Sequence, residues 1–211
     1  MPAKTTIGLS FDDGYLAQFK WARGAFRWNV PATFYINPCV INQAGWLQER
    51  MLKQMSEEWG HSIANHTWNH ESPRACRARG CSPTPFGEIV DSAERTRDWL
   101  DARGWTEASS WVALPYGQRG GQWTPKALET MRAAGFTVLR DVLFLGEEPE
   151  SRELPSALED TDTPLVEGKC NLYYFHHDFN TWDHEYEMLL NRIEAAVLDG
   201  TATVTKPPEW R

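Results

Sequence analysis

Two adjacent carboxylates, Asp12 and Asp13, stand between a short apolar run and a glycine in the stretch "LSFDDGY". At the end of an extended strand, successive side chains face opposite sides, so the two aspartates cannot share one task unless the backbone turns. Gly14 is expected to supply that turn, because glycine tolerates backbone dihedrals that other residues avoid. One carboxylate can then bind a cation while its neighbour faces a substrate. The alternative is an ordinary turn that closes a strand.

A histidine cluster follows in "GHSIANHTWNH", residues 60 to 70. His66 and His70 are four residues apart, so on one helical turn they face the same way and can chelate one metal ion through imidazole nitrogens. Two histidines and one aspartate make a site with three protein ligands and open positions for water, as hydrolytic metal sites have. His61 is predicted to be structural. It stands at the start of the preceding strand, and its spacing does not place it on the same face as His66 and His70.

The composition is typical of a globular protein with a single domain over residues 1–211, since 41% of the residues are hydrophobic and 24% are charged. The formal net charge of −8 argues against a surface that binds nucleic-acid phosphates. We expect no transmembrane segment, because a bilayer-spanning helix needs about 20 apolar residues. We expect no signal peptide, because no apolar segment precedes the first strand-like run. The predicted location is the cytoplasm or remains unknown.

Strand-like runs alternate with helix-like segments along the chain. Strands are expected in "TTIGLSF", "ATFYI", "HSIAN", near residues 109–114, in "FTVLRDVLFL" and in "NLYYFHH", and helices near 15–28, 47–58, 87–102, 124–135 and 183–199. The fourth helix has well-marked ends, because Thr124 can cap it, Pro125 suits its first position and Gly135 can end it. Alternation of this kind predicts a parallel sheet, and about seven units predict a closed or nearly closed barrel. In such a barrel the chemistry lies at the carboxyl ends of the strands.

The motifs resemble those of a known family. "SFDDG", "NHTWNH", "ALPYG", "GFTVLRD" and "YYFHHD" occur in the order found in NodB-type polysaccharide deacetylases, the carbohydrate esterases of family four, over residues from about 5 to about 180. The resemblance implies an α/β fold, a distorted (β/α) barrel of about seven strands. It also implies one divalent metal ion, usually zinc, with Asp13, His66 and His70 as ligands and Asp12 as general base.

The resemblance implies roles for residues on two later motifs as well. The backbone N–H of Tyr116 would stabilise the oxyanion, and Pro115 and Tyr116 would line the substrate site. A histidine on the last strand would protonate the departing amine. The alternation of side chains in "YYFHHD" favours His176, and His177 remains the alternative.

The chain departs from the family pattern at Ala113, where many members carry an arginine that orients the catalytic aspartate. In some branches an arginine on the next strand serves instead, which makes Arg140 the predicted substitute. The alternative for Arg140 is an ordinary strand-end salt bridge with Asp141.

A loop between the metal histidines and the next helix, "ESPRACRARGCSPTPF", must pass close to the site. Its arginines, Arg74 and Arg77 foremost, could bind an anionic group of the substrate, and a solvated loop is the alternative. Cys76 and Cys81 are predicted to be inert or local to the loop, with a bridge or a metal site as the alternative.

Several tryptophans lie near the motifs, namely Trp68, Trp111, Trp123 and Trp182. They could stack on sugar faces, and packing in the core is the alternative.

The predicted function is metal-dependent hydrolysis of the N-acetyl group of an N-acetylated amino sugar or glycan. One alternative is hydrolysis of another non-peptide C–N amide on the same barrel. The other is a glycan-binding protein with weak catalysis, which the missing arginine at position 113 would explain. The sugar and the oligomeric state do not follow from the sequence.

Overall fold

The computed structural model describes most of the chain, namely residues 5–73, 83–117, 123–143, 156–158, 165, 169–176 and 182–207. The strands are β1 (Thr5–Asp13), β2 (Thr33–Ile36), β3 (Ser62–Asn65), β4 (Trp111–Ala113), β5 (Val138–Leu143), β6 (Ser156–Leu158), β7 (Cys170–Phe175) and β8 (Ala202–Val204). The helices are α1 (Gln18–Arg27), the 3₁₀ helix η1 (Pro38–Val40), α2 (Glu49–Glu57), α3 (Phe86–Asp101), α4 (Pro125–Ala133) and α5 (Trp182–Leu198).

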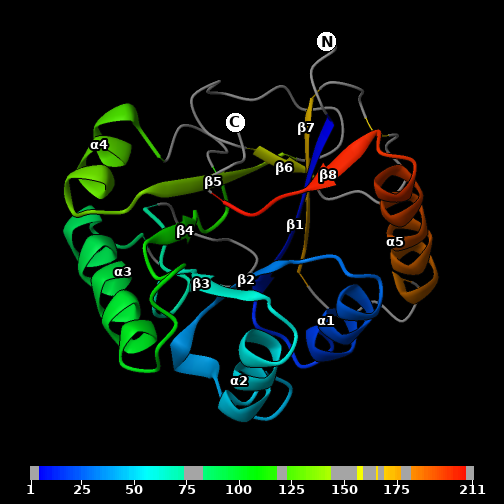
Figure 1. The fold of residues 1–211 in the computed structure, drawn as a ribbon. Coiled ribbons are helices and arrows are strands. Elements are labelled where there is room, and N and C mark those ends of the chain that lie inside the picture. The colour runs from blue at the N-terminus through cyan, green and yellow to red at the C-terminus, as the bar shows by residue number, and fades with distance from the viewer. Residues whose placement is uncertain are drawn as a thin grey trace.

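The strands form one parallel sheet in the order β2-β3-β4-β5-β6-β7-β1-β8, and a further pairing of β1 with β2 closes the ring. Near its start β1 pairs with β8, and near its end it pairs with β2, so β1 changes partner along one edge. The helices α1 to α5 lie around the outside of the strands (Figure 1). The predicted α/β barrel is therefore confirmed.

Aromatic side chains fill the space between the barrel and two of its helices. The ring of Phe11 on β1 stacks on Phe34 of β2, with ring centroids 4.6 Å apart, and also contacts Phe175 of β7. Trp21 of α1 and Tyr186 of α5 pack against the same ring from outside. Because side chains alternate along a strand, the neighbours of these phenylalanines point into the barrel.

Most element bounds agree with the sequence-based prediction. The Thr124 side chain accepts a hydrogen bond from the Ala127 N–H at 3.3 Å, and Gly135 follows α4 with φ +89°, so both predicted ends are confirmed. The prediction missed η1, β6 and β8, which have three residues each and no readable pattern. None of the helices in the described part of the chain combines the length and apolar character that crossing a bilayer requires.

Candidate metal centre and active site

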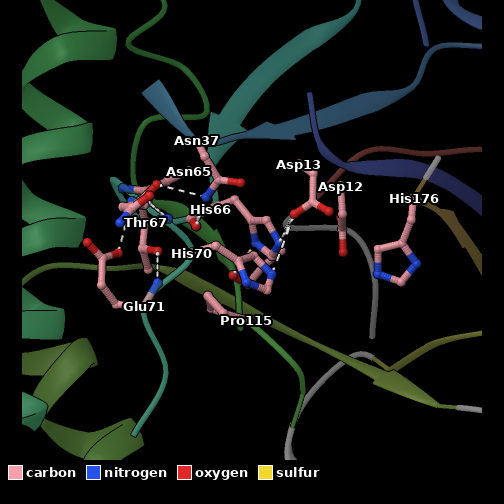
Figure 2. Close-up of polar contacts among 12 residues, drawn as sticks. Asp12, Asp13, Asn37, Asn65, His66, Thr67, His70, Glu71, Pro115 and His176 are labelled. Carbon is pink, nitrogen blue, oxygen red and sulfur yellow. Dashed lines mark hydrogen bonds and ion pairs between the residues drawn. The ribbon is translucent and has the colours of Figure 1, made fainter. Parts of the chain in front are cut away.

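The two aspartates at the end of β1 have different surroundings. Asp12 and Asp13 pair with Tyr35 and Ile36 of β2, but Asp13 already has φ +75°, and Gly14 follows with φ +90°. The turn thus begins at Asp13, one residue earlier than predicted. A Cβ at Gly14 would lie 3.3 Å from Ile36, so that position has little room for a side chain. The Asp13 carboxylate faces two histidines, with Asp12 on its other side (Figure 2).

Asp13, His66 and His70 form a cluster whose ligand atoms all lie within 4.8 Å of one another. The Oδ1 atom of Asp13 is 3.4 Å from Nε2 of His66 and 3.5 Å from Nε2 of His70. In a tetrahedral zinc site with metal–ligand distances of about 2.0–2.2 Å, two ligand atoms stand about 3.3–3.6 Å apart. The two distances from Asp13 therefore match those between the ligands of one divalent ion.

The hydrogen bond of His66 and the pKa of Asp13 suit metal binding. The Nδ1 atom of His66 is 2.9 Å from the carbonyl oxygen of Ala113, and a hydrogen bond donated there leaves Nε2 as the ligand atom. Burial alone would raise the pKa of Asp13, but the hydrogen bond from His66 and the charges of His70, His66 and His176 outweigh it. The pKa of Asp13 is thus held below its ordinary value, which keeps the carboxylate ionised.

The two histidines lie on a tight turn after β3, and the expected helical turn is wrong. Thr67 and His70 both have positive φ, +63° and +56°. The Asn37 side chain donates to the carbonyl oxygens of His66, at 2.5 Å, and Thr67, at 3.1 Å. The Asn65 side chain accepts from the Thr67 N–H and donates to the Ala93 carbonyl of α3. Side chains from two strand ends therefore impose this turn (Figure 2).

Asp12 pairs with Arg140, which is fully buried. The Nη2 atom of Arg140 donates to both carboxylate oxygens of Asp12, and Nη1 donates to the backbone carbonyl of Asp141 at 3.4 Å. The guanidinium carbon lies 4.9 Å from the ring centroid of Tyr35 and 5.2 Å from that of Tyr174. Burial alone would lower the pKa of Arg140, but the charge of Asp12 raises it above its ordinary value. Arg140 therefore keeps its positive charge inside the barrel, next to the Asp12 carboxylate.

Ala113 explains how Arg140 reaches the site. The two residues are register partners on β4 and β5, so their side chains occupy the same level of the barrel. An alanine at that level leaves space for the guanidinium group of its neighbour. The predicted contact between Arg140 and Asp12 is thus present, and the contact with Asp141 is made to its backbone.

The loop after β4 carries Pro115 and Tyr116 to the same end of the barrel. Tyr116 has φ +63°, and its ring meets that of His70 edge-on at 4.5 Å. The buried Trp123 donates from its indole nitrogen to the Pro115 carbonyl at 3.1 Å, which ties this loop to the start of α4. The loop predicted to supply the oxyanion donor is therefore adjacent to a metal-ligand candidate.

His176 follows β7 directly. The register pairs Ser10 with Tyr174 and Phe11 with Phe175, so the next position places His176 beside Asp12 on the inner face. Its ring lies 5.0 Å from that of Tyr174, and Figure 2 shows it on the far side of Asp12 from His66 and His70. His177 lies outside the described residues, so the choice between the two histidines remains a prediction.

The remaining candidates have varied positions. Trp68 is half-buried, and the Arg95 guanidinium lies 3.6 Å from its ring centroid, so one face is covered. Trp111 and Trp123 are buried and pack in the core. His61 is structural, because both ring nitrogens contact backbone atoms, of Ala32 and Ala22. Outside the described residues lie Arg74, Arg77, Cys76, Cys81 and the side chain of Trp182.

Four residues near the site escaped the sequence analysis, namely Gln18, Tyr35, Asn37 and Tyr174. Tyr174 lies in the motif "YYFHHD" but was assigned no role of its own, and the other three lie outside the motifs. Their one available signal was the strand alternation that places Tyr35 and Tyr174 on the same faces as Asp12 and His176. Gln18 and Asn37 had no such signal, because their contacts are with backbone carbonyls distant in sequence.

Residues 1–139 match the family model described as Polysaccharide deacetylase. The chain therefore belongs to the polysaccharide deacetylase family. The matched segment contains Asp12, Asp13, His66 and His70, whereas His176 lies beyond it. The sequence matches none of the curated proteins.

Solved structures of deacetylases and esterases share the fold. The Bc1960 peptidoglycan N-acetylglucosamine deacetylase is 15% identical, with a TM-score of 0.62 over 98% of this chain and 88% of its own. A family 4 acetyl xylan esterase from Clostridium thermocellum, in complex with a cobalt ion, is 17% identical, with a TM-score of 0.59 over 97% and 89%. The Streptococcus pyogenes deacetylase PplD is 20% identical, with a TM-score of 0.50 over 67% of this chain and 57% of that one. These likenesses agree with the predicted NodB-type barrel.

Proposed function

We propose that this protein is a metal-dependent hydrolase that removes N-acetyl groups from an N-acetylated amino sugar or glycan. The observation that carries the proposal is that the two adjacent aspartates make different contacts. Asp13 faces two histidines, and Asp12 pairs with a buried arginine. One carboxylate is thereby suited to hold a metal ion and the other to move a proton. Membership of the polysaccharide deacetylase family supports this reading.

We assign Asp13, His66 and His70 as ligands of one divalent ion, and zinc suits their nitrogen and oxygen atoms. The cobalt ion in the Clostridium thermocellum esterase supports a divalent site in this fold. When bound, the ion supplies a Lewis acid that polarises the acetamide carbonyl and lowers the pKa of a neighbouring water.

The chain's own residues move the protons. Asp12 accepts the proton of the water that attacks the carbonyl carbon, while Arg140 binds this carboxylate and holds its orientation. The Tyr116 N–H donates to the developing oxyanion. His176 then gives a proton to the amine nitrogen as the C–N bond breaks, so acetate and a free amino sugar are released.

Acetate release tests the activity. Purified protein should release acetate from N-acetylglucosamine oligomers or from peptidoglycan, and a chelator should abolish the release. Release from non-sugar amides alone would instead support the hydrolase of another C–N bond. Glycan binding without any acetate release would support the binding-protein alternative, which Arg140 opposes by filling the position left by Ala113.

Metal analysis tests the ligand assignment. We expect about one divalent ion per chain in the unaltered protein and loss of that ion in His70→Ala, since only two protein ligands would remain. His184→Ala is the matched control, because His184 is exposed on α5. Full metal content in folded His70→Ala would refute the site.

A further inference from the structure

Gln18, the first residue of α1, is completely buried beside the ends of β1 and β7. Its side-chain nitrogen Nε2 lies 2.5 Å from the carbonyl oxygen of Asp12 and 2.6 Å from the carbonyl oxygen of His176. Both acceptors are carbonyls, so only the amide nitrogen can occupy this position. One amide group thus links the backbone of Asp12 to that of His176, far away in the sequence.

The link lies where the sheet no longer joins these two strands. The pairs between β1 and β7 run as far as Phe11 and Phe175, whereas the pairs between β1 and β2 continue through Asp12. Asp12 and His176 are the next residues along each strand. The Gln18 amide therefore bridges the two strand ends one residue beyond their last ladder pair.

This arrangement has a free-energy cost. The second polar atom of the side chain, Oε1, is buried and has no hydrogen-bond partner among the described residues. A buried polar atom without a partner is unfavourable, so its presence calls for an explanation, and a role in the active site is one such explanation. An apolar residue of similar length would avoid this cost, but it could not donate to the two carbonyls.

We propose that Gln18 is a positioning residue that holds Asp12 and His176 at a fixed separation. This inference rests on the proposed function, in which Asp12 accepts a proton on one side of the scissile bond and His176 donates one on the other. A substrate placed between them needs both groups in place at once. Displacement of a catalytic group by about 1 Å can cost on the order of 100-fold in rate.

Two substitutions of similar length test the proposal. Gln18→Met removes the donor, and Gln18→Glu places carboxylate oxygens against two carbonyls. We expect kcat to fall roughly 10- to 100-fold in Gln18→Met and further in Gln18→Glu, by analogy with other supporting contacts. KM and metal content should stay within about twofold, because neither change touches the metal ligands or the Pro115 loop. Gln54→Met, a change at a half-buried residue of α2, should leave kcat unaltered.

A purely structural role for Gln18 would give a different pattern. Both variants would then lose thermal stability while the folded enzyme kept its kcat, and that result would overturn the proposal. If the unaltered protein releases no acetate from any substrate, the proposed function fails. Crystal structures of the unaltered protein and of Gln18→Met would then still show whether Gln18 holds Asp12 and His176 at a fixed separation. We expect the backbone of His176 to shift relative to Asp12 by about 1 Å, the scale that matters for catalysis. An unchanged separation would refute the positioning role.

Discussion

Six non-glycine residues in the described part of the chain have positive φ, and four of them belong to the candidate site: Asp13, Thr67, His70 and Tyr116. Such backbone conformations cost about 1–3 kcal/mol each, and they persist only where surrounding contacts impose them. Here they occur where the Asp13 carboxylate, the His70 imidazole and the Tyr116 ring lie close together. At the scale of single residues, the site is thus built as much from unusual backbone angles as from side-chain types.

Asp12→Asn should keep the metal ion and slow acetate release by roughly 100-fold or more, because an amide cannot accept the proton of the attacking water. The measurement is kcat together with metal content. The substitution also leaves Arg140 buried without its counter-charge, so thermal unfolding must show that the variant is folded at the assay temperature. Unchanged turnover would mean that Asp12 only closes the strand.

Arg140→Ala should lower turnover while sparing metal affinity, because the three ligands lie on other elements. It should also destabilise the fold by about 3–5 kcal/mol, since the Asp12 charge would remain buried and unpaired. Urea unfolding measures this loss.

Arg140→Lys should lose less stability than Arg140→Ala, because it keeps the positive charge. Turnover should nevertheless fall, since an ammonium group lacks the flat faces that contact Tyr35 and Tyr174. Normal turnover in Arg140→Ala would contradict the assigned role and would favour the binding-protein alternative.

At the scale of elements, side chains from neighbouring elements stabilise the turn after β3. Asn37 follows β2, and its side chain bonds the carbonyls of His66 and Thr67. Ser92 of α3 contributes a hydroxyl that accepts from the Trp68 N–H and donates to Glu71. The two metal-ligand candidates therefore depend on neighbouring elements for their orientation.

Asn37→Ala should weaken metal affinity by roughly 10- to 100-fold, the usual effect of losing a group that orients metal ligands. Competition with a chelator of known affinity measures the change. Asn171→Ala is the control, because its side chain bonds backbone carbonyls near the opposite end of the barrel. Equal metal affinities in the two variants would show that the turn keeps its shape without Asn37.

At the scale of the whole molecule, one buried histidine couples folding to pH. Burial lowers the pKa of His61 to about 4, with a smaller contribution from Lys206, although its hydrogen bond to the Ala22 carbonyl opposes the shift. An unfolded histidine has a pKa of about 6.5, so between these values the unfolded chain binds more protons than the folded protein. The contribution of His61 to stability is therefore complete above about pH 6.5 and is lost as the pH falls toward 4.

The free energy of unfolding should thus decrease by about 2 kcal/mol between pH 7 and pH 5 because of His61 alone. Urea unfolding of His61→Gln should show a correspondingly smaller decrease, even if the variant is less stable at pH 7. His184→Ala, an exposed change, should keep the full decrease. Identical pH dependence in His61→Gln and the unaltered protein would exclude His61 as the cause.

Much of the architecture could be predicted from local patterns. The alternation of apolar runs with helical segments indicated the barrel, and Thr124 and Gly135 marked the ends of α4, because caps and turns depend on a few neighbouring residues. The strands β6 and β8 could not be predicted, since a run of three residues carries no periodicity. They form because β6 pairs with β5 and β7, and β8 pairs with β1.

For the candidate site, the sequence by itself determined which groups are available: two adjacent aspartates, two histidines four apart, and an arginine on the strand beside Ala113. Only the tertiary structure decided how they are aimed. The turn at residues 66–70 is not a helix, because Asn37 and Asn65 impose positive φ angles on it. Gln18 joins the ends of β1 and β7 through backbone carbonyls, which every residue possesses and no motif can mark. Contacts of this kind depend on which strands become neighbours, and that is settled by packing over the whole barrel.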